Sequence, residues 1–228
     1  MLSAIRPPKE WATVNKIFIF QVSCIAIAVS LLLGSCSAPS PVTTTSPESP
    51  IPSEYIAYTA ESNLFSVSYP PDWGLEQDML SQVETNIKGI IAKRDAGETP
   101  DQATIIFVGG LPPSYIPAAV GLVEPLPPGI TDQEQLVAAK VDSFKASSSN
   151  YHEIKRTDTT MGGNQATVIE YQATLGGTDR HDVVSFFIAQ GMVWSVTCAS
   201  VQSEFSSYQD IFYDVSRSLR VPGITIPT

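Results

Sequence analysis

Cysteine is scarce in this sequence of 228 residues, which contains only three. Cys24 and Cys36 lie near the N-terminus, and Cys198 is the only cysteine in the remainder of the chain. A lone cysteine cannot form an intrachain disulfide. We therefore expect the globular part to rely on its hydrophobic core for stability, which a hydrophobic content of 43% allows.

Positive charge is also scarce. Lys and Arg number 13 against 23 Asp and Glu, which gives a formal net charge of -10. An acidic protein is repelled by phosphate backbones, so we expect no nucleic-acid partner. A negatively charged protein is also repelled by anionic lipid headgroups, so its attachment to a membrane requires an interaction other than charge.

The usual signatures of an enzyme active site are missing as well. The sequence has no G-x-S-x-G motif, and Gly162-Gly163 and Gly176-Gly177 are typical of turns rather than of a phosphate-binding loop. Cys198 with His152 or His181 is the only thiol–imidazole combination, and a cysteine in an apolar strand is usually a small buried hydrophobe. We expect a protein that is not an enzyme, and a hydrolase is the weakest alternative.

The N-terminus has the features of a segment that directs or attaches a protein to a membrane. Residues 1–16 are net positive, residues 17–33 contain no charge, and Gly34 and Ser35 precede Cys36. A positive segment, an apolar segment and small residues before a cleavage point define an export signal. The alternative is a single membrane-spanning anchor, although the apolar run is at the short end of what crosses about 30 Å of hydrocarbon.

This N-terminal pattern resembles the lipobox of bacterial lipoproteins. The resemblance implies that Cys36 carries a diacyl (palmitate-type) lipid on its sulfur and becomes the mature N-terminus. It predicts a lipid-anchored protein on the extracytoplasmic face of a cell membrane, periplasmic or lumenal. The expected organisation is a signal peptide over 1–35, a tether rich in Pro, Ser and Thr over 36–54, one domain over 55–222 and a tail over 223–228. We expect a monomer.

Hydrophobic periodicity predicts the elements of the domain. Helices are expected over 131–147, where Thr131 and Glu134 resemble a capping box, and over 203–220, where five apolar residues form one stripe. Strands are expected over 63–69, 74–78, 87–94, 103–108, 151–161, 165–175, 181–190 and 192–199. Short turns favour antiparallel pairing, and strands apolar on both faces require cover on both sides. The predicted fold is α+β, an antiparallel twisted sheet flanked by helices.

One segment fits neither period. Residues 109–129 contain six prolines, so we expect a long loop there. Its apolar side chains either pack back on the domain or form a patch for a partner. The residues of this candidate partner-binding patch are Tyr115, Ile116, Leu122, Val123 and Leu126.

A second candidate site lies at the turn before a central strand. Asp179, His181 and Asp182 could bind a divalent metal such as Ca or Zn, and the alternative is a solvated turn. Elsewhere, Glu170 is expected to face solvent with Gln172.

The residues FSVSYPPDW at 65–73 resemble the first strand and Pro-x-x-Trp corner of the PsbP-like family. The end of the chain is similar too, with a strand over 193–197 and a helix that carries Phe205, Tyr208 and Phe212. The resemblance implies an α/β/α sandwich used by non-catalytic proteins, some of which bind photosystem II on its lumenal side. The chain departs from the family pattern in the Pro-rich segment 109–129.

These observations lead to two main hypotheses. The first is a lipid-anchored, non-enzymatic binding or assembly factor whose partner is a membrane protein complex, with photosystem II as the example that the resemblance provides. The second is a lipoprotein that binds a small ligand or a metal, with the loop or the Asp179 cluster as its site.

Overall fold

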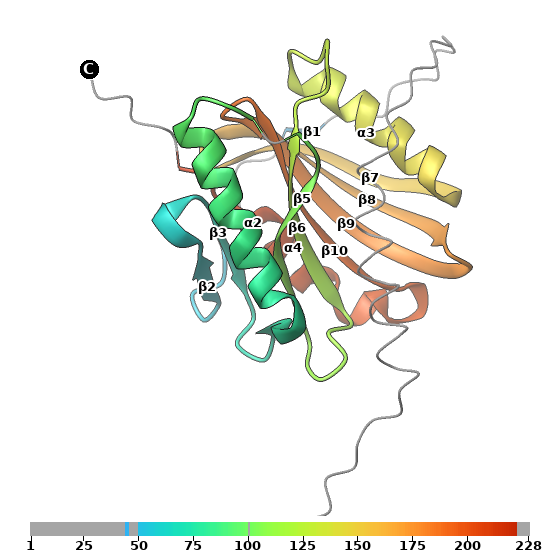
Figure 1. Cartoon of the computed structure of the whole chain (residues 1–228). Helices are drawn as coiled ribbons and strands as arrows, with labels where there is room; N and C mark the ends of the chain where they lie inside the picture. The colour runs from blue at the N-terminus through green and yellow to red at the C-terminus, as the bar shows by residue number, and fades with distance from the viewer. Residues whose placement is uncertain (1–43, 46–49, 100, 223–228) are drawn as a thin grey trace, which may run out of the picture.

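The computed structural model describes residues 44–45, 50–99 and 101–222 (Figure 1). The predicted signal peptide, Cys36 and the predicted C-terminal tail therefore lie outside the described residues. Within those ranges, no helix is both long enough and apolar enough to cross a bilayer.

An eight-stranded sheet forms the centre of the molecule (Figure 1). All of its neighbouring strands pair antiparallel except β1 and β7, which pair in parallel. In spatial order the strands are β1 (Thr44–Thr45), β7 (Ser149–Met161), β8 (Asn164–Leu175), β9 (Thr178–Ala189), β10 (Met192–Val201), β6 (Ala118–Pro125), β5 (Thr104–Gly110) and β4 (Gly74–Leu75).

Two-residue turns connect the four consecutive hairpin strands β7 to β10. Gln190 and Gly191 link β9 to β10, and both have positive φ, of 55° and 71°. Positive φ at both central residues matches the twist of a tight hairpin, which explains why glycine stands in this turn. The hairpin predicted from the alternating apolar runs is thereby confirmed.

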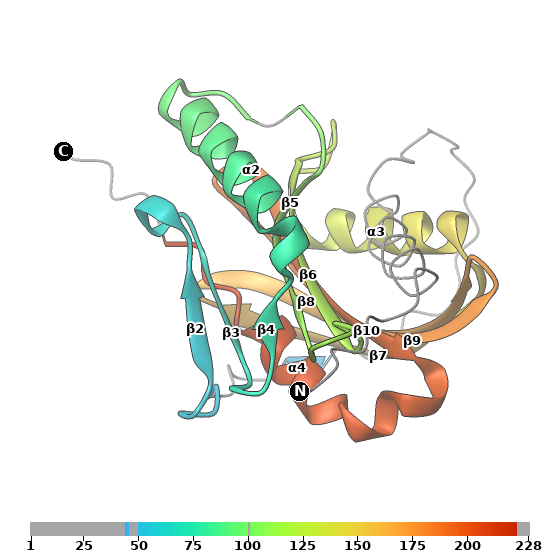
Figure 2. The same cartoon turned by 60° about the horizontal axis from the view of Figure 1, so that its bottom comes forward.

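Helices cover both faces of the sheet (Figure 2). On one face α3 (Gln133–Ser147) buries Leu136, Val137 and Phe144 in a cluster that we call the α3-side cluster. On the other, η2 (Gln202–Ser207) and α4 (Gln209–Arg217) contribute to the α4-side cluster, which also includes side chains of α2 (Gln77–Asp95). Each element places one apolar stripe against the sheet and a polar face toward solvent. The α+β fold with an antiparallel sheet between helices is confirmed.

A small hairpin lies outside the main sheet and joins the two ends of the domain. Its strands are β2 (Ile56–Thr59) and β3 (Ser66–Tyr69), with the short helix η1 (Glu61–Asn63) between them. Ser66 and Arg220 exchange both backbone hydrogen bonds, each 2.9 Å long. The Ser218 hydroxyl accepts from the Ser68 N–H at 2.8 Å.

The strand predicted over 87–94 is wrong, because this stretch lies in the long helix α2. Its buried residues Val83, Ile87 and Ile90 are spaced by four and three, which is the period of a helix. The Glu76 side chain accepts a hydrogen bond from the Asp78 N–H and caps the first turn. The strand expected over 74–78 is correspondingly reduced to the two residues of β4.

The loop predicted over 109–129 is also wrong in its centre, where β6 pairs with β5 on one side and β10 on the other. Prolines stand only at its borders: Pro117 precedes the strand and Pro125 is its last residue. Proline cannot donate to a ladder, so these positions are compatible with a central strand where interior ones would not be.

The cap of α3 is displaced by one residue from the predicted capping box. Asp132 rather than Thr131 is the N-cap, and its Oδ1 accepts from the Gln135 N–H at 2.9 Å. The Gln135 side chain reaches back and accepts from the Thr131 N–H at 2.8 Å. The pair is thus Asp132 and Gln135 in place of Thr131 and Glu134, and it differs from a capping box in that the Gln135 side chain accepts from the residue before the N-cap.

Candidate binding groove

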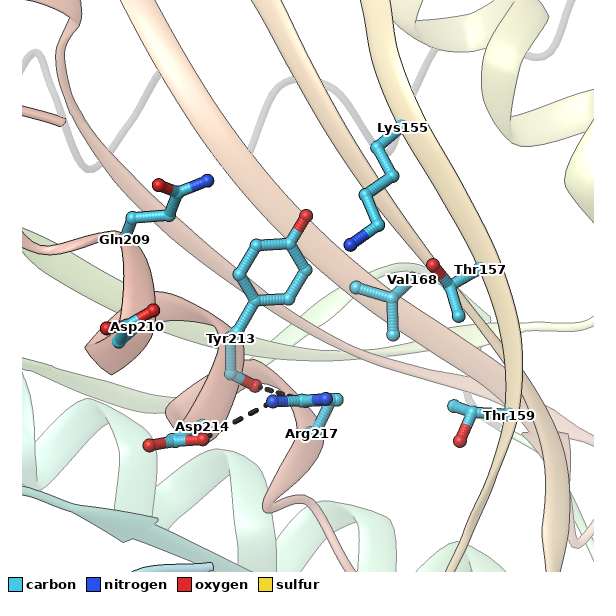
Figure 3. Close-up of a pocket in the computed structure, with 9 residues that line it drawn as sticks. All are labelled: Lys155, Thr157, Thr159, Val168, Gln209, Asp210, Tyr213, Asp214 and Arg217. Atoms are coloured by element: carbon cyan, nitrogen blue, oxygen red, sulfur yellow. Dashed lines mark hydrogen bonds and ion pairs between the residues drawn. The ribbon is translucent and has the colours of Figure 1, made fainter. Parts of the chain in front are cut away.

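A groove of about 590 Å³ lies between α4 and the edge of the sheet at β7 and β8 (Figure 3). Nine side chains line it, and only one of them is aliphatic. They are Lys155, Thr157, Thr159, Val168, Gln209, Asp210, Tyr213, Asp214 and Arg217.

One wall of the groove is the strand β7 and the other is the helix α4, and the side-chain repeat of each element places its lining residues on one side. Along β7 alternate residues share one face, so Lys155, Thr157 and Thr159 point to the same side as α4. On α4 the lining residues recur at three- and four-residue spacing, as one side of a helix requires. The helix packs on β9 and β10 and leaves β7 uncovered, so a polar groove remains between them.

Charges of both signs meet in the groove. Arg217 pairs with Asp214 at 3.3 Å and also lies over the Tyr213 ring, 5.5 Å from its centroid. Lys155 approaches the same ring from β7, with its ammonium 5.3 Å from the centroid. Among the described residues Lys155 forms no ion pair, so its charge is available to a ligand. Burial raises the pKa of Asp214, and the neighbouring Arg217 opposes that rise.

Tyr213 is held in place by a buried network beneath the groove. Its hydroxyl donates to Glu170 Oε2 at 2.5 Å, and Glu170 Oε1 lies 2.9 Å from His181 Nε2. The side-chain amide of Gln172 lies 3.3 Å from His181 Nδ1. The amide nitrogen of Gln172 is a donor, so Nδ1 accepts from it and the Nε2–H of His181 donates to Glu170. The His181 ring stacks on Phe205, with centroids 3.4 Å apart.

Glu170 was expected to face solvent, and this prediction is wrong because only 4% of its surface is exposed. Burial raises the pKa of the Tyr213 hydroxyl, and the bond to Glu170 raises it further. A buried carboxylate is tolerated when hydrogen-bond donors satisfy it, as Tyr213 and His181 do here. The network fixes the tyrosine at one position against the sheet.

The candidate metal ligands do not form one group. Asp182 is fully buried on the α3 side, where it pairs with Arg180 and accepts from the Tyr171 hydroxyl. His181 faces the α4 side, because adjacent residues of a strand point to opposite faces. Asp179 accepts from the Thr174 hydroxyl at 2.7 Å. Within the described part of the chain, no three His, Cys, Asp or Glu side chains converge in a way that could hold a metal.

The candidate patch in the Pro-rich segment is divided as well. Leu122 and Val123 lie in β6 and are buried, so they are not available to a partner. Leu126 packs against the α3-side cluster. Tyr115 and Ile116 are half-buried in the connection between β5 and β6.

Cys198 is buried in β10, opposite Val183. Burial raises the pKa of its thiol well above the ordinary value, and Asp182 adds to the effect. A thiolate is the reactive form, so this environment opposes a nucleophilic role.

Sequence reasoning missed the groove because its walls come from segments about 50 residues apart. The alternation of Lys155, Thr157 and Thr159 in a polar strand was the one local signal. Nothing near α4 in the sequence indicates that Tyr213 faces this strand.

No model of a known protein family matches the chain, and no curated protein matches it in sequence. Among solved structures, it is similar to cyanobacterial PsbP (CyanoP) from Synechocystis sp. PCC 6803, with 14% identity and a TM-score of 0.47 over 83% of this chain and 99% of that one. It is similar to protein PA94 of Pseudomonas aeruginosa, with 16% identity and a TM-score of 0.44 over 77% and 99% of the two chains. It is also similar to LpqN, involved in cell envelope biogenesis in Mycobacterium tuberculosis, with 12% identity and a TM-score of 0.44 over 74% and 91%.

Proposed function

We propose that this chain is a non-enzymatic binding protein, held on the outer face of a membrane by a lipid on Cys36, and that the groove between α4 and β7 is its binding site. The groove takes an acidic group, a carboxylate or a phosphate, that a partner protein presents. Photosystem II is one example of such a partner, which we propose because residues 65–73 resemble PsbP-like proteins.

The observation that carries the proposal is Lys155, which lines the groove on its β7 wall. Its ammonium has no carboxylate partner among the described residues and stands over the ring of Tyr213. Thr157 and Thr159 place two hydroxyl groups on the same wall. An ammonium with neighbouring hydroxyl donors is suited to an anionic group on the β7 wall. The carboxylates of the groove, Asp210 and Asp214, stand on the α4 wall, where Arg217 pairs with Asp214.

Anchoring rests on the N-terminal sequence. The positive segment, the apolar run and Gly34-Ser35-Cys36 together support export and lipidation. Attachment to the bilayer raises the local concentration of the domain beside membrane proteins, so that even a weak contact in the groove is populated.

The volume of the groove favours a second candidate function. About 590 Å³ is in the range of sites for small molecules, so a free acidic metabolite is the alternative occupant of the same site. Both candidates predict dependence on Lys155, and they differ in whether a protein is captured.

The test is affinity capture from detergent-solubilised membranes of the native organism with Lys155→Glu as the groove variant. The matched control is Lys145→Glu, which makes the same charge change at an exposed position on α3. We expect capture of a membrane protein by the wild type and the control, and a loss on the order of tenfold for Lys155→Glu.

Equal capture by the two variants would show that the groove is not the binding site. Lack of capture by every form, together with a Lys155-dependent rise in melting temperature with phosphate or dicarboxylates, would favour the small ligand. Lipidation is tested separately by metabolic labelling with an alkyne fatty acid, which Cys36→Ala must abolish.

A further inference from the structure

The strand β7 forms one border of the antiparallel sheet, and its two halves are protected differently. In its first half the register with β8 shifts twice, between Ser149 and His152 and between Glu153 and Lys155. Charged side chains follow one another there, at 153, 155 and 156. Bulges and charges are the devices by which edge strands avoid pairing with other chains.

The second half of β7 has no such protection. From Thr157 to Met161 its register with β8 is regular, and Asp158 is its one charged residue. This half accepts a further strand, because Thr44 and Thr45 pair with Thr157 and Asp158 in parallel. A segment expected to be a plain tether therefore contributes a strand to the sheet.

This pairing changes how far the domain can move from its anchor. Thr44 is eight residues after Cys36, whereas Tyr55, at the start of the domain, is 19 residues after it. At about 3.5 Å per residue, the greatest distance that the chain can span from Cys36 to the first residue held by the domain falls from roughly 65 Å to roughly 30 Å.

The docked segment lies beside the groove. Thr157 pairs with Thr44 through its backbone and lines the groove with its side chain. The anchored segment is therefore joined to a strand that is itself one wall of the groove. Lys155 lies in the same strand, two residues before Thr157.

We propose that the tether docks on β7 as a strand and thereby holds the groove close to the membrane surface. The docking depends only on the strand pairing, and the orientation at the membrane rests on the lipidated Cys36 of the proposed function. The partner group that enters the groove must then lie within about 30 Å of the bilayer.

The first test concerns docking alone and uses the exported domain with Cys36→Ser, which carries no lipid. Thr44→Pro with Thr45→Pro removes both backbone N–H groups, and Thr44→Val with Thr45→Val keeps them while changing the side chains. We expect the proline variant to exchange the edge amides beside Thr157 and Asp158, the register partners of Thr44 and Thr45, on the order of tenfold faster, and the valine variant to resemble the wild type. Equal exchange in all three forms would overturn the docking, whatever the state of Cys36.

The second test measures orientation with the lipidated chain in phosphatidylcholine vesicles that contain a headgroup-labelled acceptor lipid. A donor dye is attached at Thr160→Cys on β7 or at Lys88→Cys on α2, both at exposed positions. Energy transfer should be stronger from β7 than from α2, and the difference should vanish in the proline variant. Equal transfer from both positions in the wild type, despite protected amides, would overturn the orientation while leaving the docking intact.

Discussion

Glu170 connects the sheet to α4 through a single carboxylate. One oxygen accepts from Tyr213 and the other contacts His181, so both sides of the carboxylate are satisfied. The sequence indicated only a polar residue beside Gln172 in an otherwise apolar strand. Its partner Tyr213 is 43 positions away, so no local pattern could distinguish a buried network from a solvated face.

Tyr213→Phe should destabilise the protein by about 1–3 kcal/mol, because it leaves one oxygen of a buried carboxylate without a donor. Urea unfolding followed by circular dichroism measures the change. Tyr208→Phe is the matched control: its ring stacks on Phe212, and its hydroxyl makes no hydrogen bond within the described residues. Equal losses in the two variants would mean that the Glu170 bond contributes nothing to stability.

Two elements show where sequence patterns were misread. Residues 87–94 are rich in isoleucine, which favours a strand, but the spacing of Val83, Ile87 and Ile90 is helical. Around β6 the prolines were counted over the whole segment, although they stand only at its borders. Both errors come from weighing residue type above residue position. The elements with regular spacing, such as α3 and β9, were predicted correctly.

Two glycine substitutions test these elements with opposite expected signs. Gly89 lies in α2 with nothing within 4 Å of an added Cβ, so Gly89→Ala should stabilise by about 0.5–1 kcal/mol. At Gly110, at the end of β5, the added Cβ would meet the carbonyl oxygens of Pro117 and Tyr115. Gly110→Ala should therefore destabilise by about 1–3 kcal/mol.

Chemical denaturation of the two alanine variants beside the wild type gives both values. A destabilising Gly89→Ala would argue against a helix at this position. A neutral Gly110→Ala would show that the connection from β5 to β6 moves freely to accommodate a methyl group.

At the scale of the whole molecule, the α+β fold could be predicted because it follows from periodicity and turn chemistry repeated along the chain. The groove could not, because it depends on the position of α4 relative to β7. That position is set by the apolar stripe of Phe212, Val215 and Leu219 docking on the sheet. The stripe and the strands β9 and β10 beneath it were both visible in the sequence, but no local pattern states where across the sheet the helix docks and which strand it leaves uncovered.

Alkaline pH should unfold the protein, because seven tyrosines have a raised pKa in the folded state and burial is the first cause for each. The pKa of Tyr55, for example, is raised to about 12. Unfolded tyrosines ionise near pH 10, so the unfolded state loses protons first and stability falls as pH rises through that value.

Tyrosinate absorbance and far-ultraviolet circular dichroism, recorded together from pH 8 to 12, measure this effect. We expect ionisation and loss of secondary structure to coincide above about pH 10. Full ionisation near pH 10 in a protein that keeps its secondary structure would contradict the burial of these side chains.

The two backbone hydrogen bonds between Ser66 and Arg220 have a consequence for biosynthesis. The strand β3, near the start of the domain, pairs at Ser66 with a residue at the far end of the domain, 154 positions later. A nascent chain therefore cannot close this domain before almost all of it has been synthesised. The export proposed from the N-terminal sequence is compatible with such a delay, because the two ends of a chain that crosses a membrane in extended form meet only after translocation is nearly complete.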